Sequence, residues 1–226
     1  MKPLSVAYAV ATLTMTAQTI RCPFTPKDAV LDLDPSARFW KDVPVASFSH
    51  DSLGKDTGLK PTEVRLRWSR QFLYVLFVGP YNVLNLKPNP QTTADTVPLW
   101  DWDVAEMFIG SNFQNIQRYK EFEVSPQGEW VDLDIRKDLN EYDWHWNSAF
   151  VPTARIDEKT KTWYGGMKIP WKAIDEVREP NRGQEFRVNF FRIEGPTPNR
   201  KFLAWQPTNS ASYHVPEAFG RLLLVP

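Results

Sequence analysis

The sequence has few of the residues that carry covalent or metal chemistry. Its 226 residues include one cysteine, Cys22, so neither an internal disulfide nor a cysteine-based metal site can form. The histidines are His50, His145 and His214, which lie far apart and share no metal-ligand spacing. Nucleophile elbows, phosphate-binding loops and metalloprotease motifs are absent. The enzyme classes that such motifs identify therefore have no support.

The sequence also lacks an excess of charge of either sign. Lysine and arginine total 27, aspartate and glutamate total 27, and the formal net charge is zero. A nucleic-acid-binding surface needs a basic excess or a basic run, and neither is present. No apolar run reaches the roughly 18 residues of a membrane-spanning helix. We therefore expect no nucleic-acid partner and no membrane span.

The first 23 residues leave two interpretations open. Lys2, followed by the fairly apolar stretch 4–17, is similar to a weak signal peptide. Threonines interrupt that stretch, and residues 5–10 equally fit a first strand. The segment 1–23 is thus either an N-terminal strand or a weak signal segment. In the second case the protein is extracellular or periplasmic.

Proline and tryptophan, by contrast, are abundant. The chain has 19 Pro and 10 Trp. Many prolines with few helical stretches predict short strands joined by turns. Ten tryptophans exceed the needs of one core, which predicts that some of them lie at the surface. These counts indicate a β-rich domain with aromatic side chains to spare for binding.

Strand patterns dominate residues 24–226. Residues 63–68 alternate polar and apolar side chains, residues 72–78 form an unbroken apolar run, and a tight turn joins them. Further strands are expected at 104–109, 119–124, 130–135, 150–156, 162–168, 185–193, 201–205 and 221–225. One short helix is expected at 170–178, beginning at Pro170. The pattern predicts an all-β fold: a two-sheet antiparallel β-sandwich with one short helix, forming one domain over 24–226.

An ordered set of short motifs in this region resembles a known family. The motifs are Leu31-Asp32-Leu33-Asp34, Phe39-Trp40, the 65–78 hairpin, Trp102–Ile109, Phe122–Trp130, Ile169-Pro170-Trp171, Phe190-Phe191-Arg192, Trp205 and Pro216–Leu222. The set is similar to the family 9 carbohydrate-binding modules, and most of all to their stand-alone family 9-like relatives. The resemblance covers roughly residues 24–225.

This resemblance implies both a fold and a function. Family 9 modules are β-sandwiches that hold a mono- or oligosaccharide between two tryptophan rings without cleaving it, with structural calcium nearby. By position, Trp100 and Trp205 match the two tryptophans, and Glu106 matches the acidic residue that follows the first. The implied function is non-catalytic carbohydrate binding through a tryptophan-lined cleft.

A long loop independently marks the region before Trp100. Residues 79–99 are rich in proline and lack periodicity, and so long a loop inside a domain is usually functional. Trp100 and Trp102 follow it and would point the same way in an extended chain. Aromatic ring faces stack on the C–H groups of sugars. We expect Trp100, Trp102 and Trp205 to flank one cleft, which Trp144 and Trp146 could extend.

Arg192 and the nearby acidic residues are candidates for polar contacts. Arg192 interrupts an apolar strand, and a buried arginine needs a partner. Either a carboxylate such as Glu106 or Glu123 neutralises it, or it donates to ligand oxygens. The expected ligand-binding residues are Trp100, Trp102, Glu106, Glu123, Arg192 and Trp205, with no catalytic residue.

Three other functions stay open. A glycoside hydrolase needs two positioned carboxylates, and the sequence offers Asp101, Asp103, Glu106, Glu121, Glu123, Asp132 and Asp134. A b-type haem electron-transfer domain of similar fold would need axial ligands such as Met107 or Met167. A degenerate sandwich without a sugar site would bind a protein partner or no known ligand. No cofactor is expected apart from a structural calcium, for which Asp101 and Asp103 offer carboxylates.

Overall fold

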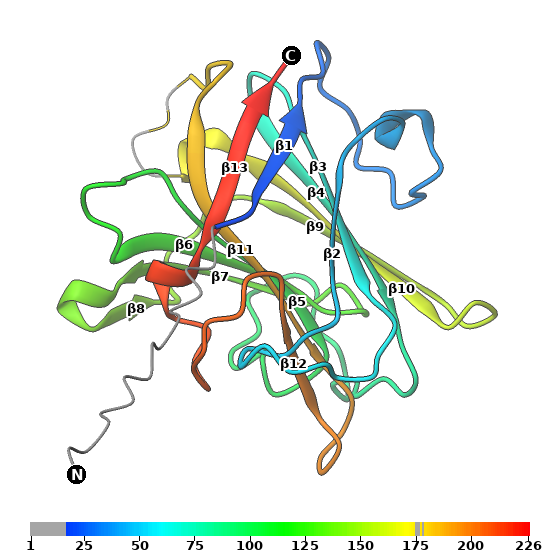
Figure 1. Ribbon diagram of the computed structural model, residues 1–226. Coiled ribbons are helices and arrows are strands. Elements are labelled where there is room, and N and C mark those ends of the chain that lie inside the picture. The colour runs from blue at the N-terminus through cyan, green and yellow to red at the C-terminus, as the bar shows by residue number, and fades with distance from the viewer. Residues whose placement is uncertain (1–16, 175–176, 178) are drawn as a thin grey trace, which may run out of the picture.

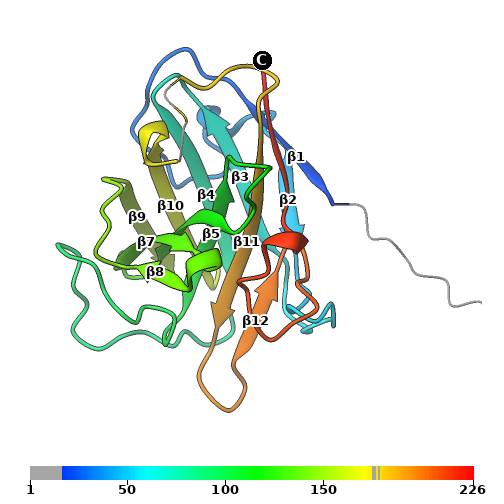
Figure 2. The same ribbon diagram turned by 90° about the vertical axis from the view of Figure 1, so that its left-hand side faces the viewer.

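The computed structural model describes residues 17–174, 177 and 179–226. It confirms the expected fold class, because two β-sheets pack face to face and carry nearly all of the regular structure (Figure 1; Figure 2). The strand proposed for residues 5–10 lies outside the described residues. None of the helices that the structure describes is long and apolar enough to cross a membrane.

Within the described residues, thirteen strands form a larger and a smaller sheet. The larger sheet comprises β1 (Thr19–Pro23), β5 (Val104–Gly110), β6 (Arg118–Val124), β7 (Trp130–Arg136), β8 (Glu141–Asp143), β11 (Glu185–Glu194), β12 (Lys201–Ala204) and β13 (Gly220–Val225). The smaller comprises β2 (Val45–Phe48), β3 (Thr62–Trp68), β4 (Phe72–Pro80), β9 (Val151–Asp157) and β10 (Thr162–Pro170). The strand orders are β1-β13-β11-β5-β6-β7-β8, with β12 on β11, and β2-β3-β4-β10-β9.

Every strand expected between residues 63 and 225 is confirmed, and the structure adds β1, β2 and β8. Adjacent strands are antiparallel except for β1 and β13, which run parallel and side by side in Figure 1. The helix expected at 170–178 is a three-residue 3-10 helix, Trp171–Ala173. Residues 175, 176 and 178 of that segment lie outside the described residues. The other described helices are also 3-10 turns of three residues: Arg38–Trp40, Lys137–Leu139 and Pro216–Ala218.

The main core lies between the two sheets. Alternate residues of β3, including Val64 and Leu66, point into this layer, as period-two alternation requires. They meet Met107 of β5 and Phe190 of β11 from the larger sheet, together with Trp163 of β10. Burial of this apolar layer stabilises the sandwich, at roughly 25 cal/mol per Å² removed from water.

The outer face of the larger sheet carries a second apolar layer. All seven residues of β5 are buried, because this central strand is covered on both sides. On the outer side, Phe108 packs against Phe191 and against Phe219, which follows the 3-10 helix Pro216–Ala218. Leu99 belongs to the same cluster. Chain segments around residues 99 and 213–219 therefore cover part of this face, and the uncovered part holds the cavity described next.

Candidate carbohydrate-binding cavity

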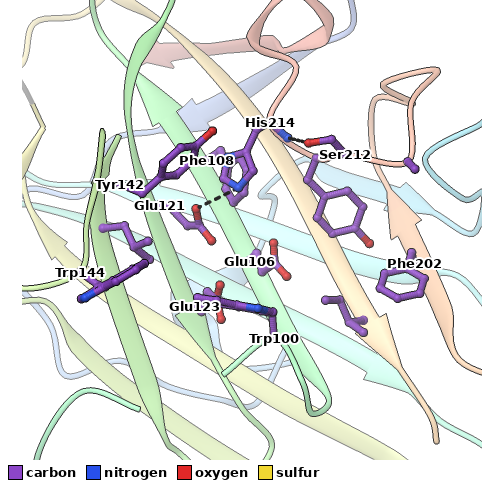
Figure 3. A pocket seen from close by; sticks show the side chains of 14 residues that line it. Trp100, Glu106, Phe108, Glu121, Glu123, Tyr142, Trp144, Phe202, Ser212 and His214 are labelled. Atoms are coloured by element: carbon purple, nitrogen blue, oxygen red, sulfur yellow. Dashed lines mark hydrogen bonds and ion pairs between the residues drawn. The ribbon is translucent and has the colours of Figure 1, made fainter. Parts of the chain in front are cut away.

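A cavity of about 300 Å³ opens on the outer face of the larger sheet (Figure 3). Strands β5, β6, β7 and β11 supply its floor; β8, β12, the segment before β5 and the segments after β8 and β12 supply its walls. The lining residues are Trp100, Glu106, Phe108, Glu121, Glu123, Leu133, Tyr142, Trp144, Ile193, Phe202, Ala211, Ser212, Tyr213 and His214. The cavity thus combines an aromatic wall with a cluster of carboxylates.

The carboxylates meet at the floor because of strand register. Glu106 of β5 lies directly opposite Glu123 of β6, and Phe108 lies opposite Glu121. Side chains two residues apart share a face of a strand, so Glu121 and Glu123 point the same way. One oxygen from each of the three side chains lies within 4.8 Å of the others. Figure 3 shows the three carboxyl groups between Trp100, Tyr142 and Phe202.

These three carboxyl groups are almost fully removed from solvent. The exposed fraction is 2% for Glu106, 4% for Glu121 and 0% for Glu123. Burial, followed by the charge of Glu121, raises the pKa of Glu106 well above its ordinary range. Burial also raises the pKa of Glu123, and the nearby Glu106 and Glu121 add to that shift. Like charges on paired strands repel each other and destabilise the sheet. This floor is therefore suited to a ligand that donates hydrogen bonds or carries positive charge.

His214 closes one side of the cavity. Its Nε2 lies 4.0 Å from Oε2 of Glu121, and its Nδ1 is 2.9 Å from the hydroxyl of Tyr119. The imidazole stacks on Phe108, with ring centroids 5.1 Å apart. The backbone N–H of His214 donates to Ser212 Oγ at 3.1 Å. These contacts fix the ring against the acidic floor.

The aromatic walls come from three separate chain segments. Trp144 follows β8 and is 44% exposed, which leaves part of its ring free for a ligand. Tyr213 stacks on Phe191 with centroids 4.0 Å apart and planes 13° from parallel. Trp100 is half-buried and lines the same cavity as Glu123 (Figure 3). The cavity therefore presents ring faces and ring edges around a polar floor, as sugar sites require.

Arg200 holds the segment that carries Trp100. Its guanidinium donates to the carbonyl oxygens of Trp100, Asp101 (2.6 Å) and Trp102 (2.9 Å). A planar guanidinium makes several bonds in fixed directions, so it restrains three consecutive residues at once. This contact joins the turn between β11 and β12 to the end of the long loop.

A model of the carbohydrate family 9 binding domain-like family matches residues 36–226, which is most of the chain. The chain belongs to this family. The resemblance drawn from short motifs is thereby confirmed at the level of the family.

Relatives of this family 9-like domain extend the comparison. An "Extracellular protein" of the fungus Arthroderma benhamiae is 25% identical over 98% of this chain and 97% of its own length. A putative carbohydrate-binding protein from Bacteroides uniformis has a TM-score of 0.70 at 17% identity, covering 92% of this chain and all of that one. A family 9 module from Caldicellulosiruptor kristjanssonii, solved with cellotriose, has a TM-score of 0.65 at 17% identity, covering 92% and 94%. These solved structures share the fold of the domain.

Three of the residues expected to bind ligand line the cavity: Trp100, Glu106 and Glu123. Trp102 is half-exposed but lies outside the cavity lining. Arg192 and Trp205 point to the opposite face of the larger sheet. The expected grouping of Trp100, Trp102 and Trp205 around one cleft is therefore not the arrangement in this structure.

A carboxylate neutralises Arg192, as one of the two expected alternatives has it, but that carboxylate is neither Glu106 nor Glu123. Arg192 pairs with Ala105 in the register of β11 and β5, so its side chain shares the inner face with Ala105. Glu106 and Glu123 lie on the outer face, one sheet thickness away. Arg192 instead forms an ion pair with Glu194 at 2.9 Å, and it is fully buried. The arginine thus supports the core between the sheets.

Trp205 also belongs to the inner core, where it is only 5% exposed. Ala204 pairs with Phe191, whose side chain is on the outer face, so the next residue points inward. The Trp205 ring packs against Phe190 with centroids 5.3 Å apart. A Cβ added at Gly220 would lie 2.5 Å from this ring. Close packing on that side explains why Trp205 does not reach the cavity.

Sequence reasoning had singled out Glu121 only as one of many acidic residues, and it missed Tyr142, Phe202 and Tyr213. The alternating Glu121-Phe122-Glu123 pattern was the available signal for Glu121, because it places both glutamates on one face. The aromatic residues come from short strands and loops, where no periodicity marks them. Trp144 lines the cavity, whereas Trp146 packs against Phe122, with the two ring centroids 6.2 Å apart.

The methionines named for a haem site and the aspartates named for a calcium site lie outside the cavity. Met107 and Met167 are both fully buried between the sheets. The Asp103 side chain is buried and accepts the Gly195 N–H at 2.7 Å, whereas Asp101 is exposed. Neither aspartate lines the cavity. Among the described residues, the acidic side chains that bring one oxygen each close to a common point are Glu106, Glu121 and Glu123.

Proposed function

We propose that the cavity on the outer face binds a mono- or oligosaccharide without cleaving it. The observation that carries this proposal is the combination, in one cavity of a family 9-like domain, of aromatic walls with a carboxylate floor. Sugar C–H groups stack on ring faces, and sugar hydroxyls donate to carboxylate oxygens. Trp100 and Trp144 supply ring surface, and Glu106 supplies an acceptor.

The position of the carboxylates supports binding rather than hydrolysis. Canonical glycoside hydrolysis uses two carboxyl groups that flank the scissile bond from different sides. Glu106, Glu121 and Glu123 lie side by side on one sheet face, at the floor of the cavity. A sugar above them therefore meets all three from the same side.

The names of the relatives guide the choice of ligand and location. Family 9 modules from Caldicellulosiruptor kristjanssonii were solved with cellotriose and with glucose. Glucose and short β-linked glucose oligomers are accordingly the first ligands to test. The fungal relative is named an extracellular protein, which supports a secreted location for this domain as well.

Calorimetric titration of the intact chain with glucose and cellotriose tests the proposal. Replacing Trp100 with alanine is expected to weaken binding about five- to tenfold, because one well-placed ring contributes about 1–1.4 kcal/mol and each 1.4 kcal/mol is a factor of ten. Trp102→Ala is the matched control, since Trp102 lies two residues away but outside the cavity. Its affinity should stay within about twofold of the parent, given that it loses no cavity contact.

Two results would contradict this assignment. Equal affinity in the parent and in a folded Trp100→Ala variant would place the sugar elsewhere. Release of reducing sugar from an oligosaccharide, lost in Glu106→Gln, would replace binding with hydrolysis.

A further inference from the structure

We propose that Glu106, Glu121 and Glu123 bind one divalent cation at the floor of the cavity, and that calcium is the cation they suit best. This site is separate from the Asp101 and Asp103 carboxylates considered from the sequence. It also stands without the proposed sugar ligand, because it rests on the carboxylates alone.

The first support is geometric. Glu106 and Glu123 are paired across β5 and β6, and Glu121 is two residues along the same face. One carboxylate oxygen from each lies within 4.8 Å of the other two. Calcium binds oxygen at about 2.3–2.6 Å, so ligands across one ion are separated by up to about 5 Å. The three oxygens therefore fit around one calcium ion without rearrangement of the strands.

The second support is that the carboxylates lack hydrogen-bond partners. Both oxygens of Glu123 are buried and without a partner, as are Oε1 of Glu106 and Oε2 of Glu121. Glu123 is fully buried yet lines the cavity, so its carboxylate faces the same space as the other two. Leaving a buried charged group without a partner costs several kcal/mol in general. A cation in this space would satisfy all three side chains together.

The surrounding charges leave room for such a cation. The basic group within ion-pair range of the cluster, among the described residues, is His214, 4.0 Å from Glu121. The Arg200 guanidinium is directed at three backbone carbonyls, those of Trp100, Asp101 and Trp102. Three carboxylates carry up to three negative charges, and a divalent ion offsets two of them.

The chemistry of the ligands favours calcium among divalent ions. Calcium takes six to eight oxygen ligands in a flexible geometry, whereas magnesium requires near-ideal octahedral geometry at about 2.0–2.1 Å. Zinc prefers sulfur and nitrogen ligands, and this cluster offers oxygen alone. Water in the cavity completes the coordination, because Glu106 and Glu121 retain slight exposure there.

Terbium luminescence and calorimetry test this site on the intact chain, freed of metal by a chelator and without sugar. Terbium replaces calcium in oxygen sites and emits when a nearby indole transfers energy to it, and Trp100 lines the same cavity as Glu123. We expect saturable indole-sensitised emission that calcium displaces, with calcium affinity in the micromolar to millimolar range. Glu123→Gln and Glu106→Gln should each weaken calcium binding at least tenfold.

Glu129→Gln is the matched control. Glu129 is fully buried and has one oxygen without a partner, but it lies outside the cavity and accepts from Ser125 Oγ. Its calcium affinity should stay within twofold of the parent. Thermal unfolding of each metal-free variant checks that the fold is kept, and the glutamine variants should melt no lower than the parent because they relieve repulsion.

The inference is overturned if the folded parent shows no saturable calcium binding up to about 10 mM, the weak end for extracellular calcium modules being near 1 mM. It is also overturned if binding survives both glutamine substitutions, or if zinc binds there and calcium does not. Since no sugar is present, none of these results bears on carbohydrate binding.

Discussion

Replacing Glu194 with alanine is expected to lower the free energy of unfolding by about 3–5 kcal/mol, the usual cost of removing one partner from a buried ion pair. Glu194 is 3% exposed and lies 2.9 Å from the fully buried guanidinium of Arg192. Without this carboxylate the arginine charge stays in the core, where Thr62 Oγ1 and the Pro80 carbonyl accept only part of its hydrogen bonds. Chemical denaturation of both proteins measures the loss.

A double-mutant cycle shows whether the pair is the cause. Replacing both Arg192 and Glu194 with methionine removes both charges. The double variant should therefore lose clearly less stability than the sum of the losses in Arg192→Met and Glu194→Met. Additive costs would show that the two side chains stabilise the core independently. A loss below about 1 kcal/mol in Glu194→Ala would contradict burial of the pair.

Asp103 is expected to give the domain a pH-dependent stability between about pH 4 and pH 7. Burial raises the pKa of this carboxyl from its ordinary value of 3.8 to about 7, although the Gly195 N–H and the Arg192 charge oppose that rise. The folded state therefore binds a proton in this range that the unfolded state has released. Stability from this group is complete below the unfolded pKa and is lost as the pH rises through the folded one.

The comparison of wild type with Asp103→Asn isolates this effect. The asparagine oxygen can still accept from Gly195, but the side chain does not titrate. Denaturation at several pH values should show the wild type losing stability relative to the variant by up to about 4 kcal/mol from pH 4 to pH 8, at about 1.4 kcal/mol per pKa unit. Parallel curves for the two proteins would contradict a raised pKa at Asp103.

Strand positions were predictable from the sequence because burial of one or both faces of a strand requires an alternating or continuous run of apolar residues. Residues 63–68 alternate and residues 72–78 are continuously apolar, and both became adjacent strands of the smaller sheet. Short strands with weak patterns were not predictable. β1, with the sequence Thr-Ile-Arg-Cys-Pro, forms by parallel pairing with the distant β13, and local sequence carries no record of that partner.

The site was less predictable than the fold, because the face on which a side chain lies depends on register. Ala204 pairs with Phe191 and shares its outer face. Trp205 is the next residue, so its indole points to the opposite face and lies in the core. The same alternation separates Arg192 from Glu106 and Glu123. Aromatic walls such as Tyr142 and Tyr213 come together only through tertiary packing.

The central claim is that carbohydrate binds in the cavity on the outer face of the larger sheet. The most direct measurement follows the indole N–H signals of the ten tryptophans by NMR during titration with glucose and cellotriose. Saturable shifts of the Trp100 and Trp144 signals, with the buried Trp205 and Trp163 signals unchanged, are the predicted result. Saturable shifts at Trp205 with Trp100 and Trp144 unchanged would contradict it.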